Sequence, residues 1–169
     1  VTLFEDNLVE GVENYSLQMQ NLANLSAPTS ALNIMDTATG TIIDNDVDLV
    51  ISPATVTHNE GNSGNTTYTF TVTRSGELDG TTTVNYAVTG TGANPANADD
   101  FGGTLPSGTV TFNATETTKP ITIDVSGDTT VEPDENFIVT LSGGADSVAN
   151  HRVDIETATA TGVITTDDT

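Results

Sequence analysis

The sequence predicts an all-β protein, an immunoglobulin-like antiparallel β-sandwich that occurs as tandem repeats with the first copy partial. Three observations support this fold class. The composition favours strands and turns, since Thr, Val, Ile, Gly and Asn dominate. Apolar and polar residues alternate with a period of two in several short segments. An acidic turn followed by such a segment occurs twice, at a fixed spacing.

The repeat is read from two related stretches, EDNLVEGVENY (5–15) and GDTTVEPDENF (127–137). Glu10 aligns with Glu132 and Tyr15 with Phe137, an offset of 122 (132 − 10 and 137 − 15). The same offset, without a gap, aligns TATG at 37–40 with TATG at 159–162. We therefore predict that residues 1–46 are the C-terminal half of one copy and that residues 47–169 are a complete copy.

Period-2 alternation gives the strands of the second copy in order. We expect them at 48–58, 66–74, 81–89, 109–113, 120–126, 136–142 and 157–165, with the remaining strands of the first copy near 1–4, 14–21 and 36–43. Gly- and Asn-rich turns separate the strands, and residues 90–107 are expected to be a plain connector. The residues expected to face the core are Tyr68, Phe70, Val72, Val84, Tyr86, Val88, Val110, Phe112, Ile121, Ile123, Val125, Phe137, Val139 and Leu141. About seven strands with one apolar face indicate a sandwich.

The charge balance restricts the possible partners. There are 24 acidic residues against three basic ones, Arg74, Lys119 and Arg152, and the formal net charge is −21. Such a chain repels the phosphates of nucleic acids and anionic membrane surfaces. Its charge is compatible with cation binding or with solubility in a salty extracellular medium. No apolar run is long enough for a membrane span. The absence of cysteine excludes disulfides and thiolate chemistry. We expect the three basic residues at the surface or at strand edges.

The acidic turns point to a cation. Glu135 has the strand parity of Phe137, so its carboxylate should face inward at one end of the sandwich, as Glu13 should beside Tyr15. A charged group there is costly unless it is paired, and three basic residues cannot serve so many acids. The neighbouring acids expected at the same end are Asp128, Glu132, Asp167 and Asp168. In the first copy, Asp44-Asn45-Asp46 is the equivalent of Thr166-Asp167-Asp168.

The residue types favour calcium over zinc. Convergent carboxylates without Cys or clustered His suit Ca²⁺, which takes about 6–8 oxygen ligands. Zinc requires nitrogen or sulfur ligands, and His58 and His151 are single in the sequence. The simpler interpretation is that an acidic turn in so acidic a chain is a solvated loop.

The run ADDF…GTVTF…ITIDVSGDTTVEPDENFIVTLSGG…ATGVITTDD (98–168) resembles a Calx-beta domain, a module of sodium–calcium exchangers and large bacterial surface proteins. The first 46 residues, which end in ATGTIIDND, resemble the back half of another. The resemblance implies calcium bound at the distal loops. The ligands it implies are Glu60, Asp100 (or Asp99), Asp128, Glu132, Glu135, Asp167 and Asp168 in the second copy, and Glu5, Asp6, Glu10, Glu13, Asp44 and Asp46 in the first.

Two departures from the calcium-sensing members reduce the expected ligand number. Those members often carry two acids where this chain has Gly127-Asp128, and three where it has Thr166-Asp167-Asp168. We therefore expect one or two ions in the second copy, with dissociation constants on the order of 10⁻⁴–10⁻³ M.

These features predict a non-catalytic, calcium-binding structural or adhesive module of an extracellular or cell-surface protein with many repeats. Because 44–48 joins the copies with almost no slack, calcium there is expected to stiffen the junction. The alternatives are a calcium-sensing regulatory module and a subunit of a head-to-tail filament completed by strand exchange. The expected partners are neighbouring repeats or identical subunits, with no nucleic acid or membrane insertion and an unidentified surface or glycan ligand. A glycosidase pair at Glu132 and Glu135 is disfavoured, because no Trp is present to stack on a sugar.

Overall fold

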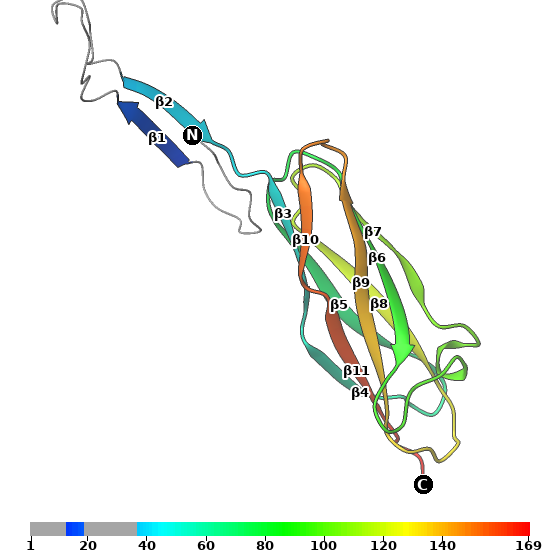
Figure 1. Cartoon of the computed structure of the whole chain (residues 1–169). Helices are drawn as coiled ribbons and strands as arrows, with labels where there is room; N and C mark the ends of the chain where they lie inside the picture. Colours follow the sequence, from blue (N-terminus) through cyan, green and yellow to red (C-terminus); the bar gives the residue numbers. More distant parts are fainter. Residues whose placement is uncertain (1–12, 19–36) are drawn as a thin grey trace, which may run out of the picture. The chain divides into compact units, whose positions relative to one another are not determined.

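The computed structural model describes residues 13–18 and 37–169, which fall in two compact units. One unit contains residues 45–169 and the other lies within residues 10–44. The larger unit is a β-sandwich whose strands run along its long axis (Figure 1). Within the described residues, no helix is long and apolar enough to cross a membrane.

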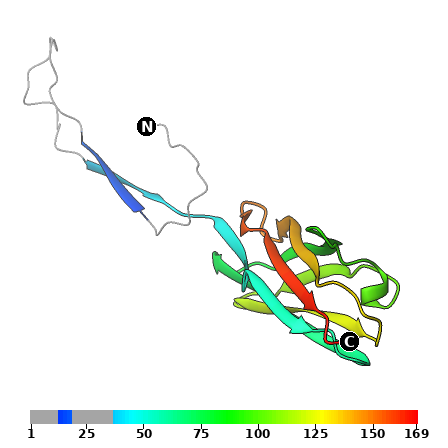
Figure 2. The ribbon, with the colours of Figure 1, turned by 90° about the horizontal axis from the view of Figure 1, so that it is seen from below.

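Two sheets form the sandwich, as the view in Figure 2 also shows. The first sheet has the order β10-β3-β5-β8 and the second has the order β4-β11-β9-β6-β7. The strands are β3 (Asp46–Ser52), β4 (Thr55–Asn59), β5 (Gly64–Gly76), β6 (Thr82–Gly90), β7 (Ser107–Phe112), β8 (Thr118–Gly127), β9 (Glu135–Asp146), β10 (Arg152–Thr157) and β11 (Thr159–Thr165). The sandwich class predicted from the alternation is confirmed.

The core lies between the sheets. Every side chain predicted to face it is buried, except Tyr86, which is partly buried against the same cluster. The ring of Phe137 lies at the centre of an aromatic group. Tyr68, Phe70 and Phe101 meet it edge-on, at centroid distances of 5.3, 6.4 and 5.4 Å. Edge-to-face packing of this kind stabilises a core beyond the area that it buries.

The expected antiparallel pairing of the last strand with β9 is confirmed, but the division into strands differs from the prediction at both ends of this copy. The segment 48–58, within which one strand was expected, divides at Ser52–Pro53 into β3 and β4, which belong to different sheets. Pro53 lacks an N–H and cannot continue a ladder, so the chain changes sheet there. The strand β10 was not predicted, and β11 begins after it. The β10–β3 and β11–β4 pairs are both parallel, so the sandwich is not wholly antiparallel.

The smaller unit contains an antiparallel pair, β1 (Glu13–Gln18) and β2 (Thr37–Ile42). Glu13 pairs with Ile42, and Glu135, 122 residues later, pairs with Ile164. The two strand pairs therefore have the same register at the offset found in the sequence. The strand expected at 1–4 lies outside the described residues.

The prediction of a surface or strand-edge position was wrong for Arg74, which is 1% exposed. Its Nη1 donates to Gly80 O (3.0 Å) and to Thr82 Oγ1 (2.8 Å). Its Nη2 donates to the carbonyls of Leu78 and Asn113, each at 3.2 Å. The guanidinium also lies 5.5 Å from the centre of the Phe112 ring. A buried charge is tolerated here because backbone carbonyls accept its hydrogen bonds.

Lys119 and Arg152, the other two basic residues, pair with nearby acids. Lys119 Nζ lies 2.8 Å from Glu116 Oε1, and Arg152 Nε lies 3.3 Å from Asp154 Oδ2. Each of these two basic side chains is therefore paired with an acid close to it in the sequence.

Candidate metal centre

Two groups of carboxylates lie in loops and at strand ends of the sandwich. These loops are at the end of the sandwich where the C-terminus lies (Figure 1). The Glu60 cluster consists of Glu60, Asp128 and Asp168, and the Glu135 cluster consists of Asp100, Glu132 and Glu135. In each cluster, one oxygen from each residue lies within 4.8 Å of the other two. All six residues belong to the ligand set implied by the resemblance to the Calx-beta domain, and the fold brings them together from four segments.

Glu60 follows β4 and is 5% exposed. Its backbone is fixed, since its N–H donates to Thr165 O (3.2 Å) and its carbonyl accepts from Thr66 Oγ1 (2.7 Å). Its side-chain Oε1 and the Oδ2 of Asp168 are buried without a hydrogen-bond partner in the described part of the chain. Buried carboxylate oxygens without donors are costly, and a bound cation would satisfy them.

Asp100 reaches the second cluster through the connector between β6 and β7. This connector contains a short 3₁₀ turn (Asp99–Phe101), and its backbone is attached to β9 by hydrogen bonds from Thr91 N and Ala96 N to Asn136 O (3.0 and 2.9 Å). Asp100 is 7% exposed, and its Oδ2 accepts from Asn97 N at 2.6 Å. The connector is therefore not the plain loop predicted. It fixes a buried acid beside Glu135, the first residue of β9.

The electrostatics of the site show mutual repulsion. The pKa of Glu135 is raised to about 7 by burial first, then by the charge and hydrogen bond of Asp100 and by the charges of Glu132 and Glu60. Burial and neighbouring carboxylates also raise the pKa of Glu60 and of Glu132. The charges that act on Glu60 include Glu132 and Asp100, so the two clusters are coupled. A divalent cation would remove the repulsion that otherwise favours protonation.

Other acids implied as ligands lie nearby but outside the clusters. Asp167 is exposed, and its Oδ1 accepts from Gly61 N (3.2 Å), which holds the chain end against the β4–β5 loop. Asp99 is exposed, and its charge contributes to the raised pKa of Glu132. The sequence analysis missed Asp134, whose Oδ1 accepts from Thr166 N at 3.2 Å. Its position in the same acidic loop was the available signal.

The acids of the first copy form no cluster among the residues that the structure describes. Glu13 is exposed at the start of β1, and Asp44 follows β2. Asp46 is 6% exposed and begins β3 of the sandwich, where its carbonyl accepts from Glu77 N at 3.0 Å. Glu5, Asp6 and Glu10 lie outside the described residues.

The donor set of the two clusters consists of carboxylate oxygens, which are hard ligands. Such a set fits one or two divalent cations of the Ca²⁺ type, which accept irregular geometry and several carboxylates. A bound cation would also coordinate the two buried oxygens that lack hydrogen-bond donors, Glu60 Oε1 and Asp168 Oδ2.

The sequence matches the Calx-beta domain over residues 1–46 and 48–168. The chain belongs to the Calx-beta domain family. No match was found among curated proteins.

Several solved structures share the Calx-beta fold. The apo form of the Calx CBD1 domain is 20% identical, with a TM-score of 0.58 over 72% of this chain and 98% of that one. The calcium binding domain CBD12 of CALX1.1 is 22% identical, with a TM-score of 0.57 over 71% and 46%. The Calx CBD2 domain is 15% identical, with a TM-score of 0.57 over 69% and 85%. At these identities the similarity establishes the fold alone.

A third group that could hold a metal ion was not predicted. It consists of Glu77, Asp79 and His151 and lies in loops at the other end of the sandwich. The expectation that His151 is unclustered was therefore wrong. Its partners come from a loop about 70 residues earlier in the chain, which a sequence pattern does not reveal.

Proposed function

We propose that this protein is a non-catalytic, calcium-binding structural module of an extracellular or cell-surface protein built from tandem Calx-beta repeats. The observation that carries the proposal is the pair of buried oxygens, Glu60 Oε1 and Asp168 Oδ2, that lack donors beside further carboxylates. Calcium would coordinate these oxygens and neutralise the repulsion that raises the pKa of Glu60.

Calcium titration calorimetry on the chelator-treated, tag-free chain tests calcium binding. We expect one or two ions per chain, with dissociation constants on the order of 10⁻⁴–10⁻³ M. Glu60→Gln should weaken binding by at least about tenfold, which corresponds to about 1.4 kcal/mol. Glu156→Gln, a neutralised and exposed acid outside the clusters, is the matched control. Absence of heat from the wild type, or equal binding by both variants, would contradict the proposal.

The structural role is a further step of the same proposal. The two matched ranges are separated by a single residue in sequence, so successive repeats have almost no linker. In this proposal, calcium bound by the acids of each repeat limits the motion between successive repeats, and its removal leaves mutual repulsion. Small-angle X-ray scattering with calcium and with EGTA measures this effect. An unchanged maximum dimension would count against a stiffening role while leaving calcium binding intact.

A regulatory module is the second candidate, favoured by the similarity in fold to the calcium binding domain CBD12 of CALX1.1. The affinity separates the two roles. Intracellular sensors respond at about 10⁻⁷–10⁻⁵ M calcium, whereas extracellular modules bind at about 10⁻⁴–10⁻³ M. A measured constant in the lower range would favour regulation.

A further inference from the structure

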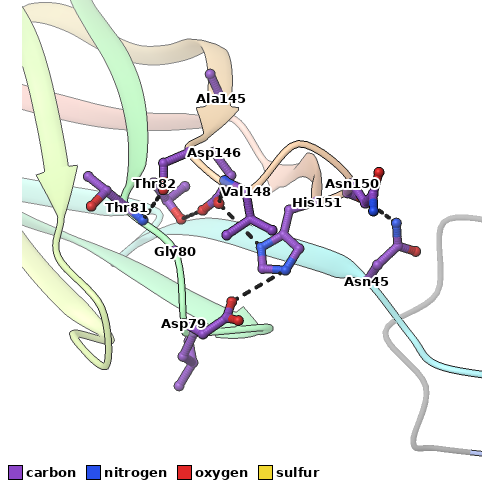
Figure 3. Close-up of polar contacts among 12 residues, drawn as sticks. Asn45, Asp79, Gly80, Thr81, Thr82, Ala145, Asp146, Val148, Asn150 and His151 are labelled. Atoms are coloured by element: carbon purple, nitrogen blue, oxygen red, sulfur yellow. Dashed lines mark hydrogen bonds and ion pairs between the residues drawn. The ribbon is translucent and has the colours of Figure 1, made fainter.

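The side chain of His151 lies between two carboxylates at the end of the sandwich opposite the candidate calcium centre (Figure 3). It is 8% exposed, in the loop between β9 and β10. Its Nδ1 lies 3.2 Å from Asp146 Oδ1, and its Nε2 lies 3.3 Å from Asp79 Oδ1. A carboxylate oxygen of Glu77 completes a group whose members lie within 4.8 Å of one another.

Asp146 lies on the Nδ1 side of the imidazole. Its side chain is fully buried, and it accepts hydrogen bonds from Thr82 Oγ1 (2.6 Å) and from Val148 N (2.9 Å), which fix the position of its carboxylate. Because Nδ1 of His151 faces Asp146, the other nitrogen, Nε2, is the one directed at Asp79 and Glu77.

This arrangement directs Nε2 at carboxylate oxygens, and either a proton on Nε2 or a metal ion between the groups can join them. Zinc is bound by His nitrogen and carboxylate oxygen at about 2.0–2.2 Å, so two ligand atoms of a tetrahedral site are about 3.3–3.5 Å apart. The 3.3 Å between Nε2 and Asp79 Oδ1 agrees with that spacing. A carboxylate that holds the second imidazole nitrogen is also the usual support of a metal-binding histidine.

The loop that carries the two acids is rigidly held. Leu78 O accepts from Arg74 Nη2 and from Thr115 N, while Gly80 O accepts from Arg74 Nη1. A Cβ at Gly80 would lie 2.0 Å from Asp146 Oδ1, so only glycine lets the loop approach the buried acid. Asp79 itself is 71% exposed, which leaves a route for an ion to enter.

We propose that His151, Asp79 and Glu77 form a second, nitrogen-containing metal site that binds a borderline divalent ion such as Zn²⁺, with water in the remaining position and Asp146 orienting the histidine. The mixed donor set distinguishes this site from the all-oxygen centre at the other end, because imidazole favours zinc and its neighbours over calcium. With three protein ligands it resembles an open zinc site rather than a closed four-ligand one.

The test is a Zn²⁺ titration of the tag-free full chain in saturating calcium, measured by calorimetry. A parallel titration with Co²⁺ is measured by the visible absorption of the bound ion. Calcium occupies the carboxylate centre, so the readout reports the nitrogen-containing site. We expect one Zn²⁺ per wild-type chain and loss of that binding in His151→Asn. Asp146→Asn should weaken it by about 10–100-fold.

Two controls keep the outcome interpretable. Asp79→Asn changes an exposed ligand and avoids disturbing the buried histidine, so its loss of binding cannot be attributed to unfolding. His58→Asn, which removes the other, exposed histidine, should bind zinc as the wild type does. Absence of zinc binding by the wild type, or unchanged binding by His151→Asn and Asp79→Asn, would show that the imidazole is a simple ion-pair partner and would overturn the proposal. Glu135→Gln should leave zinc binding unchanged, which separates this result from that of calcium.

Discussion

Gly162 on β11 lies opposite Phe137 on β9, and its Cα is so close to the phenyl ring that an added Cβ would be 2.0 Å from Phe137 Cζ. The relationship recurs between Gly40 and Tyr15, where a Cβ would be 2.4 Å from the ring. The glycine leaves room for a ring on the neighbouring strand. In each TATG segment the glycine therefore leaves space for the aromatic ring on the paired strand. This explains why the similarity between the two copies includes the glycine.

Replacing Gly162 with alanine should lower the free energy of unfolding by about 1–3 kcal/mol, since the new methyl group overpacks the core. Urea unfolding followed by circular dichroism measures the change. In the double variant with Phe137→Leu, the smaller side chain should accept the methyl group, so the two effects should be less than additive. Strict additivity would show that the contact is not the cause.

Tyr68→Phe should destabilise the sandwich by about 0.5–1.5 kcal/mol, the usual net value of a hydrogen bond. The Tyr68 hydroxyl lies 2.9 Å from both His58 O on β4 and Val163 O on β11, so it supports the parallel pair that closes the second sheet. Burial raises the pKa of Tyr68 to about 12, and the hydroxyl therefore remains a donor. Equal midpoints for wild type and variant in urea would contradict this role.

Glu135→Gln should have opposite effects with and without calcium. In EGTA, the neutral amide removes repulsion from Asp100 and Glu132, so the unfolding temperature should rise. In calcium the variant loses a charged ligand, and the stabilisation by calcium should fall. Differential scanning calorimetry in both buffers gives the two values. A drop in unfolding temperature in EGTA would contradict the electrostatic picture.

The stability of the calcium-free protein should depend on pH through the same residue. The folded-state pKa of Glu135, about 7, lies above its ordinary value of 4.5, so the folded protein holds the proton more tightly than the unfolded chain. Its contribution to stability is then fully present below about pH 4.5 and is lost as the pH rises through about 7. The difference between wild type and Glu135→Gln, measured by urea unfolding from pH 4.5 to 8, isolates this effect. A difference that does not vary with pH would contradict the raised pKa.

Arg74→Lys should destabilise the protein even though it preserves the charge. One ammonium group cannot reproduce the two-nitrogen contacts with Gly80 O, Leu78 O and Asn113 O, and groups left unpaired cost about 1–3 kcal/mol each. We expect a loss of at least about 1 kcal/mol in chemical denaturation. Lys119→Arg, at a half-exposed basic residue, should be close to neutral and serves as the control.

Much of the fold and part of the candidate centre can be predicted from the sequence. The alternation in 66–74 and 136–142 places Tyr68 and Phe137 in the core, because side chains on a strand alternate between faces. The same parity places Glu135 at the inner edge of the sandwich. The acidic turn and the offset of 122 residues identify Asp128, Glu132 and Asp168 as candidate ligands. These features are local or periodic, so they can be recognised in the sequence without the tertiary structure.

Only the tertiary structure decides which distant groups meet. It separates β3 from β4, makes their pairs with β10 and β11 parallel, and fixes Asp100 beside Glu135 through backbone hydrogen bonds to Asn136. It also buries Arg74 among carbonyls and encloses His151 between Asp79 and Asp146. The sequence determines strand faces and acidic turns through short-range periodicity, whereas the partners of a buried charge depend on which loops the two sheets bring to the same end.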